Sequence, residues 1–220
     1  MRFYDKIAIN TGAKMSFVIF DTEYTSWHGC QEHGWHGRQK REIVQISALR
    51  VSNDLRVLDT FNVLCKPTIN PILSDYFIKL TGITNEQIQR RGISFPKAYK
   101  KFKKFVGKSH CLSHGYGGKW SDKCDGEIIL ENLKMNKMPI DDDIKYHNIS
   151  AWLIPEYNRA RMREHPKNSG KIAKFLHEDN KITKLGIDEH NALYDSYSIL
   201  MGIKHFHNDL ESLLKKILYN

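Results

Sequence analysis

The chain has 220 residues, of which 40% are hydrophobic and 27% are charged, so its composition is that of a globular protein with one substantial core. Aromatic residues make up 11%, and apolar runs recur along the whole chain, which excludes an intrinsically disordered protein. Lys and Arg outnumber Asp and Glu by 34 to 25, and the net charge of +9 favours a polyanionic partner. No uncharged apolar stretch approaches the ~18 residues that a membrane helix needs.

The first third of the chain predicts three strands. The first is a short apolar run, as in a buried strand, and the other two alternate apolar and polar residues. Asn53 and Asp54 lie between the second and third runs and indicate a hairpin turn, so these strands pair antiparallel. The predicted elements are the strands Ser16–Asp21, Glu42–Val51 and Arg56–Cys65, and the loop Ser26–Lys40, which is rich in Gly, His and Trp.

Helices dominate the rest of the chain and alternate with two short strands. Thr84 is the predicted N-cap of one helix. This order predicts an α/β fold, with a mixed sheet that is antiparallel over its first three strands and then parallel, and with helices on both sides. The predicted helices are Ile72–Leu80, Thr84–Arg90, Phe95–Val106, Asp125–Met135, Ala151–Arg161, Gly170–His177, Asn191–Gly202 and His207–Leu218, and the strands are Cys111–Ser113 and Ile144–Ile149.

The chain is predicted to form a single domain over residues 15–220, with its core over residues 15–202. Residues 1–14 are basic and polar, and we expect them to form a leader without the apolar segment of a secretory signal. The four cysteines are sparse and include no C-x-x-C pair, so we expect a reducing cytoplasmic location rather than a disulfide framework.

Two acidic residues at the end of the first predicted strand suggest a metal site. Residues two apart on a strand project to the same face, so the carboxylates of Asp21 and Glu23 lie together and repel each other. A hard divalent cation removes that conflict, because Mg²⁺ takes carboxylate oxygens as ligands. The alternative is that both side chains point into solvent, and the pair alone leaves both interpretations open.

Three further candidates lie near predicted helix starts. His190 and Asp195 are five positions apart, which separates them by ~140° on an ideal helix. We therefore expect His190 in the preceding loop, turned toward a site, and Asp195 on the helix. Asp125 opens another helix after a Gly-rich loop. An N-cap role is the alternative for Asp125, and a capping or surface role is the alternative for His190.

In this order, the motifs resemble those of the DEDDh family of 3′–5′ exonucleases, which has a ribonuclease H-like fold. Phe17–Thr25 is similar to the first motif of the family, a strand that ends in Asp-x-Glu, and His190–Asp195 matches the third motif, His-x-Ala-x-x-Asp. Glu42–Leu49 resembles the second strand of the family, and Leu80–Ile88 resembles the segment after the third strand. The resemblance covers most of the chain, from Phe17 to Leu200.

The second motif of the family is the weakest match. Asp122 and Asp125 compete for its aspartate, and the loop before them is longer than is usual in the family. Asp125 is the better candidate, because Ile128 and Ile129 follow it at helical spacing.

The resemblance implies metal-dependent hydrolysis at a nucleic-acid 3′ end. Asp21, Glu23, Asp125 and Asp195 would hold two Mg²⁺ or Mn²⁺ ions, as in the family. His190 would take the proton from the attacking water, for which an unperturbed histidine pKa of ~6.5 is suitable. The product would be a nucleoside 5′-monophosphate. The alternatives are a nucleic-acid-binding module without catalysis and a DNA proofreading or repair exonuclease.

The chain looks most similar to the Eri-type small exonucleases that trim RNA ends, so single-stranded RNA 3′ ends are favoured over DNA. The residues expected to contact the substrate are Thr22, Tyr24, Thr25, Trp27 and His114, and the predicted loop 26–40 adds aromatic and basic side chains. We expect the nucleic-acid backbone phosphates to be contacted by Arg159, Arg161, Arg163 and Lys167. A zinc site at His28, Cys30, His33 and His36 is the alternative for the loop, but the spacing fits no standard pattern.

Overall fold

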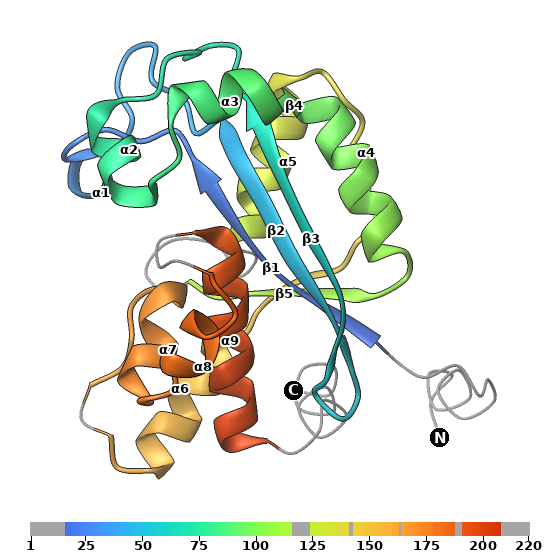
Figure 1. The fold of residues 1–220 in the computed structure, drawn as a ribbon, viewed down its shortest axis with the longest axis vertical. Helices are drawn as coiled ribbons and strands as arrows, with labels where there is room; N and C mark the ends of the chain where they lie inside the picture. Colours follow the sequence, from blue (N-terminus) through green and yellow to red (C-terminus); the bar gives the residue numbers. More distant parts are fainter. Residues whose placement is uncertain (1–15, 116–123, 141–142, 163, 188–190, 208–220) are drawn as a thin grey trace.

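The computed structural model describes residues 16–115, 124–140, 143–162, 164–187 and 191–207, which form a mixed sheet with helices on both faces (Figure 1). The order of the six described strands is β4-β3-β2-β1-β5-β6. Neighbours among the first three strands are antiparallel, β5 and β6 run parallel to β1, and β4 runs parallel to β3. The predicted mixed topology is therefore confirmed. The strands are β1 (Ser16–Tyr24), β2 (Ile43–Ser52), β3 (Val57–Lys66), β4 (Ile93–Ser94), β5 (His110–Ser113) and β6 (Tyr146–Asn148).

Strand β1 continues three residues beyond its predicted end, so Asp21 and Glu23 lie within the strand. Asp21 is opposite Ser47 of β2, and Glu23 is opposite Gln45. Antiparallel pairing continues to Tyr24, which extends the strand past its apolar run. Because alternate residues of a strand project to one face, this extension fixes both carboxylates on the same side of the sheet.

One face of the sheet is covered by α4 (Phe95–Val106) and α5 (Asp125–Met135) (Figure 1). Both helices have the predicted bounds. Phe102 of α4 is fully buried, with its ring centroid 5.5 Å from that of Phe20 on β1. The described lysines of α4 are exposed, as expected for a solvated helix face. The aromatic residues of α4 therefore serve the core, as predicted, and its charges face solvent.

The opposite face carries α9 (Ala192–Phe206), which packs across β1 and β2 (Figure 1). Asp195 lies in the first turn of this helix. This helix begins one residue after its predicted start and runs four residues past its predicted end, because Ile203 is fully buried in the core and Phe206 packs against it. His207 is the C-cap. The rest of the predicted C-terminal helix and the predicted leader lie outside the described residues.

Shorter helices pack beside α9, and they differ most from the sequence pattern. The helix predicted over Gly170–His177 is a 3₁₀ turn, η2 (Ser169–Lys171), followed by a single-turn helix. The sequence pattern also did not predict α8, a further single-turn helix. The helices here are α6 (Ser150–Arg159), α7 (Ile172–Phe175) and α8 (Asn180–Thr183). Apolar residues of α6 and α7 close the core around Tyr157, whereas Ile182 of α8 packs in a separate cluster with Ala173 and Tyr194.

Three short helices lie at the end of the sheet where β1 finishes (Figure 1). They are α1 (Cys30–His33), α2 (Asp75–Thr81) and α3 (Asn85–Arg91). Thr84 and Gln87 form a capping box at the start of α3, which confirms the predicted N-cap. Helix α1 is a single turn inside the predicted loop 26–40. No helix in the described part of the chain combines the length and hydropathy needed to cross a membrane.

Candidate active site

A cavity of about 610 Å³ opens where β1 ends, and four predicted acidic residues line it. Asp21 and Glu23 come from β1, Asp125 is the first residue of α5, and Asp195 lies in the first turn of α9. Residues from α1, from the end of α2 and from the segment before η2 line the remaining walls. The fold therefore brings together side chains that are up to 174 positions apart in the sequence.

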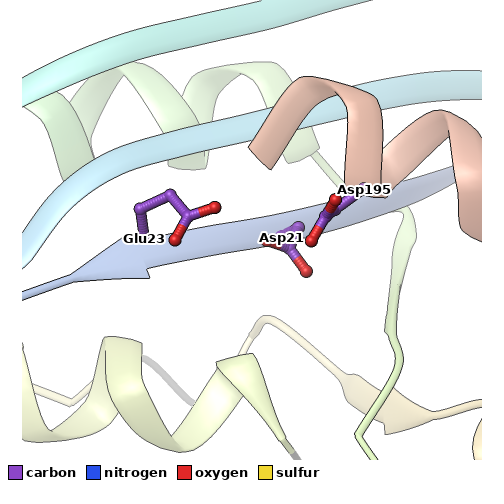
Figure 2. A group of neighbouring side chains, drawn as sticks. All are labelled: Asp21, Glu23 and Asp195. Carbon is purple, nitrogen blue, oxygen red and sulfur yellow. The ribbon is translucent and has the colours of Figure 1, made fainter. Parts of the chain in front are cut away.

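Three of the four carboxylates are close enough to share one cation. Asp21, Glu23 and Asp195 each offer an oxygen, and these oxygens lie within 4.8 Å of one another (Figure 2). Figure 2 shows Asp195 pointing from α9 toward Asp21, with Glu23 further along β1. Within the described residues, no other group of three His, Cys, Asp or Glu side chains is spaced this closely, so the zinc interpretation of His28, Cys30, His33 and His36 gains no support.

Asp125 is held against β1 by Thr22. The Thr22 backbone N–H and its hydroxyl both donate to Oδ1 of Asp125, over 3.0 and 2.6 Å. These bonds fix the carboxylate in the same cavity as the other three. Asp122, the competing candidate for the second motif, lies outside the described residues. The structure thus gives Asp125 a place at the site.

Burial and mutual repulsion make this cluster costly to ionise without a counter-charge. Burial raises the pKa of Asp21 and of Glu23 well above the usual range, and the neighbouring carboxylates raise both further. Burial also raises the pKa of Asp125 to about 6, although the Thr22 hydrogen bonds act in the opposite direction. Carboxylate oxygens are ligands that Mg²⁺ and Mn²⁺ favour, so the donor set fits a hard divalent cation.

Ser169 also belongs to the site, and sequence reasoning missed it. Its hydroxyl lies 2.9 Å from Oδ1 of Asp21 and 3.0 Å from Oδ2 of Asp195. The residue is buried in η2, 148 positions from Asp21. A single serine in a polar segment carries no local signal for such a role, because its significance depends on which distant side chains the fold places beside it.

The start of α9 is tied to β2 by a side-chain network that fixes Asp195 relative to β1. Asn191 caps the helix by accepting a hydrogen bond from the Leu193 N–H over 2.9 Å. Gln45 accepts from the Ala192 N–H over 3.1 Å and donates to Asn191 over 3.1 Å. His190 immediately precedes this network in the sequence but lies outside the described residues.

The predicted substrate contacts divide into two groups. Thr22, Tyr24 and His114 line the cavity, whereas Thr25 and Trp27 do not. The Thr25 hydroxyl donates to the Lys40 carbonyl over 2.5 Å and accepts from the Glu42 N–H over 3.0 Å, so it closes the base of the 26–40 segment.

Trp35 is the tryptophan of this segment that lines the cavity. Its Nε1–H donates to the Thr25 carbonyl over 3.0 Å, and its ring centroid lies 5.8 Å from that of Tyr24. The Arg41 guanidinium lies 5.5 Å from the Trp35 ring centroid and is paired with Glu131 of α5. The wall at Trp35 is therefore fixed from several sides.

Four residues are predicted to contact backbone phosphates, and one of them lines the cavity in the part of the chain that the structure describes. Lys167 lines the cavity. Arg159 is paired with Glu156, and Arg161 is exposed outside the cavity. Arg163 lies outside the described residues.

Comparisons with known proteins identify the family of the chain. A family model described as Exonuclease (RNase_T) matches residues 18–201. The 3′-5′ exoribonuclease 1 of Rattus norvegicus is 27% identical over 187 residues, which cover 82% of this chain and 50% of that protein. The protein of the same name from Homo sapiens is 39% identical over 61 residues, 27% of this chain and 17% of that protein. The chain thus spans at most half the length of these two curated relatives.

Solved structures share the fold. Cell-death related nuclease 4 matches with a TM-score of 0.67 and 18% identity, covering 90% of this chain and 64% of that one. The nuclease domain of 3′hExo, a DEDDh family member bound to rAMP, matches with a TM-score of 0.59 and 24% identity, covering 88% and 92%. Because the family model spans most of the sequence and the DEDDh motifs fall within it, the chain belongs to the Exonuclease family of DEDDh-type 3′–5′ exonucleases.

Proposed function

We propose that the chain is a metal-dependent 3′–5′ exonuclease that removes nucleotides from the 3′ end of single-stranded RNA and releases nucleoside 5′-monophosphates. The observation that carries the proposal is the acidic cavity, in which oxygens of Asp21, Glu23 and Asp195 lie within 4.8 Å of one another. Membership of the Exonuclease family supports the reaction class.

The four carboxylates would hold two Mg²⁺ or Mn²⁺ ions, with Asp125 on the side of Thr22 and Asp195 on the side of α9. Such ions, when bound, activate the attacking water and offset charge on the phosphate. His190 is proposed to accept the proton of that water, since a histidine titrates near neutral pH.

The cavity wall suggests how the 3′-terminal nucleotide would be held. Tyr24 and Trp35 provide aromatic surface for a base, and Lys167 provides a cation for a backbone phosphate. A volume of about 610 Å³ has room for one nucleotide beside the carboxylates. The preference for RNA draws on the relatives that are named exoribonucleases and on the structure that is described as bound to rAMP.

The test is degradation of 5′-labelled single-stranded RNA and DNA in Mn²⁺, with and without EDTA. We expect a ladder of 3′-shortened products that EDTA abolishes, with RNA degraded faster than DNA. Asp21→Asn should abolish the ladder, whereas Asp59→Asn, at an exposed carboxylate of β3, should retain it. Substrate binding without metal-dependent shortening would contradict the proposal, and equal rates on DNA would contradict the preference for RNA.

A further inference from the structure

We propose that Ser169 is a positioning residue, which holds the carboxylates of Asp21 and Asp195 in the orientation that binds a divalent cation. The inference rests on the proposed function, because it concerns the same acidic cavity. It adds a neutral side chain from a fourth element, η2, to the four carboxylates that the sequence motifs indicate.

The hydroxyl of Ser169 bridges two elements that approach each other only through the tertiary fold. Its Oγ lies 2.9 Å from Oδ1 of Asp21 on β1 and 3.0 Å from Oδ2 of Asp195 on α9. Both distances are in the range of hydrogen bonds that involve a hydroxyl and a carboxylate. The hydroxyl carries one hydrogen, so it donates to one of the two carboxylates at a time, and this contact holds the mutually repelling oxygens of Asp21 and Asp195 beside the same atom.

The turn that carries Ser169 is itself anchored by α9. The Ser198 hydroxyl donates to the Ser169 carbonyl over 2.6 Å and accepts from the Ala173 N–H over 2.9 Å. Ser198 is fully buried and lies three residues after Asp195, so the two side chains are neighbours on the helix surface. One helix therefore supplies a carboxylate and also the anchor for the residue that orients it.

Gly170 completes the contact on the other side of Asp195. A Cβ at this position would lie 2.6 Å from Oδ1 of Asp195 and 3.2 Å from its Cγ. The backbone of η2 is thus packed directly against the carboxylate, and only glycine leaves the necessary space. The hydroxyl of Ser169 and the backbone at Gly170 together restrict how Asp195 can rotate.

Calorimetric titration with Mn²⁺ tests the inference without reference to catalysis. Loss of a partner that orients a metal ligand typically lowers affinity 10–100-fold, and we expect a loss of about this size for Ser169→Ala. Ser169→Thr keeps the hydroxyl and should restore most of the affinity. Ser150→Ala is the matched control, because it makes the same change at a buried serine that does not line the cavity, and it should bind like the wild type.

Nuclease assays at graded Mn²⁺ give a second readout. Ser169→Ala should need more Mn²⁺ for half-maximal activity but regain the wild-type kcat at saturation, with an unchanged KM for RNA, because Ser169 acts on the carboxylates. Wild-type Mn²⁺ affinity in folded Ser169→Ala would overturn the inference. Should that variant fail to fold, Ser169→Cys applies the same test, because a thiol is similar in size but only a weak hydrogen-bond donor, and wild-type affinity there would also overturn the inference.

The two proposals fail in different ways. A wild-type protein that neither binds Mn²⁺ nor hydrolyses RNA in its presence would contradict the proposed function. A wild-type protein that does both, together with an unchanged Ser169→Ala affinity, would contradict only the positioning role.

Discussion

The buried carboxyl of Asp125 should make the metal-free protein less stable as the pH rises. Burial raises its pKa from 3.8 to about 6, despite the hydrogen bonds from Thr22. When folding raises the pKa of an acid, its protonated form contributes to the free energy of unfolding. This contribution is complete at a pH below the pKa of the unfolded state, and it is lost as the pH rises through the pKa of the folded state. At 1.36 kcal/mol per pH unit, the loss above about pH 6 amounts to about 3 kcal/mol.

Asp125→Asn removes this charge, and with it the repulsion that helps to raise the pKa of Asp21 and of Glu23. The Asn side chain keeps an Oδ1 that can accept both Thr22 hydrogen bonds, but it carries no charge at any pH. Burial lowers the pKa of His114 and of His147 to about 4, which gives the opposite pH dependence, but both histidines are present in both proteins and cancel in the comparison.

The assay is urea denaturation in EDTA at a series of pH values. Between about pH 4 and about pH 8, the difference in unfolding free energy should shift by about 3 kcal/mol or more in favour of Asp125→Asn, because the variant also relieves the repulsion on Asp21 and Glu23. A shift of about 3 kcal/mol corresponds to roughly 6–12 °C in Tm for a domain of this size. Added Mn²⁺ should stabilise the wild type more than the variant, since the ion offsets the charge. A stability difference that stays constant from about pH 4 to about pH 8 would refute the reasoning.

Three further predictions concern the substrate and the proton acceptor. In steady-state kinetics, Trp35→Ala should raise KM for RNA about 10-fold, because it removes a stacking surface. Trp27→Ala, outside the cavity, should leave KM unchanged, and equal effects of the two variants would contradict the assignment. Lys167→Ala should reduce the slope of log affinity against log salt concentration by about 0.7, because one phosphate contact is lost. Lys97→Ala, at an exposed lysine, is the control, and an unchanged slope for Lys167→Ala would contradict the phosphate contact. His190→Ala should retain RNA binding and lose ~10²–10⁴ in kcat, and near-wild-type turnover would exclude it as the general base.

Local patterns in the sequence predicted much of the fold, because strands and helices have a short repeat that can be seen in neighbouring residues. The bounds of α4 and α5 match their apolar spacing, and the capping box at Thr84 confirms the start of α3. The pattern was least reliable where elements are a single turn long, as in η2 and α1. Such turns are set by contacts with the rest of the fold rather than by their own sequence.

The candidate site shows the same division. Asp21 and Glu23 could be placed on one face of β1 from their spacing alone, and the motif order pointed to Asp195. The choice of Trp35 over Trp27 as the cavity residue could not be read from the loop, because both are aromatic residues in a polar segment. The tertiary structure decides it, because Trp35 lines the cavity with its Nε1–H bonded to the Thr25 carbonyl, whereas Trp27 does not line it.

By itself, then, the sequence determined the mixed α/β class, the basic charge and the acidic motifs, since each is a property of composition or of residues close together in the chain. Only the tertiary structure decided which side chains surround those motifs. Ser169 is 148 positions from Asp21 and 26 from Asp195, yet one hydroxyl contacts both. Contacts of this kind follow from the packing of α9 and η2 over β1, and no local pattern of residues encodes them.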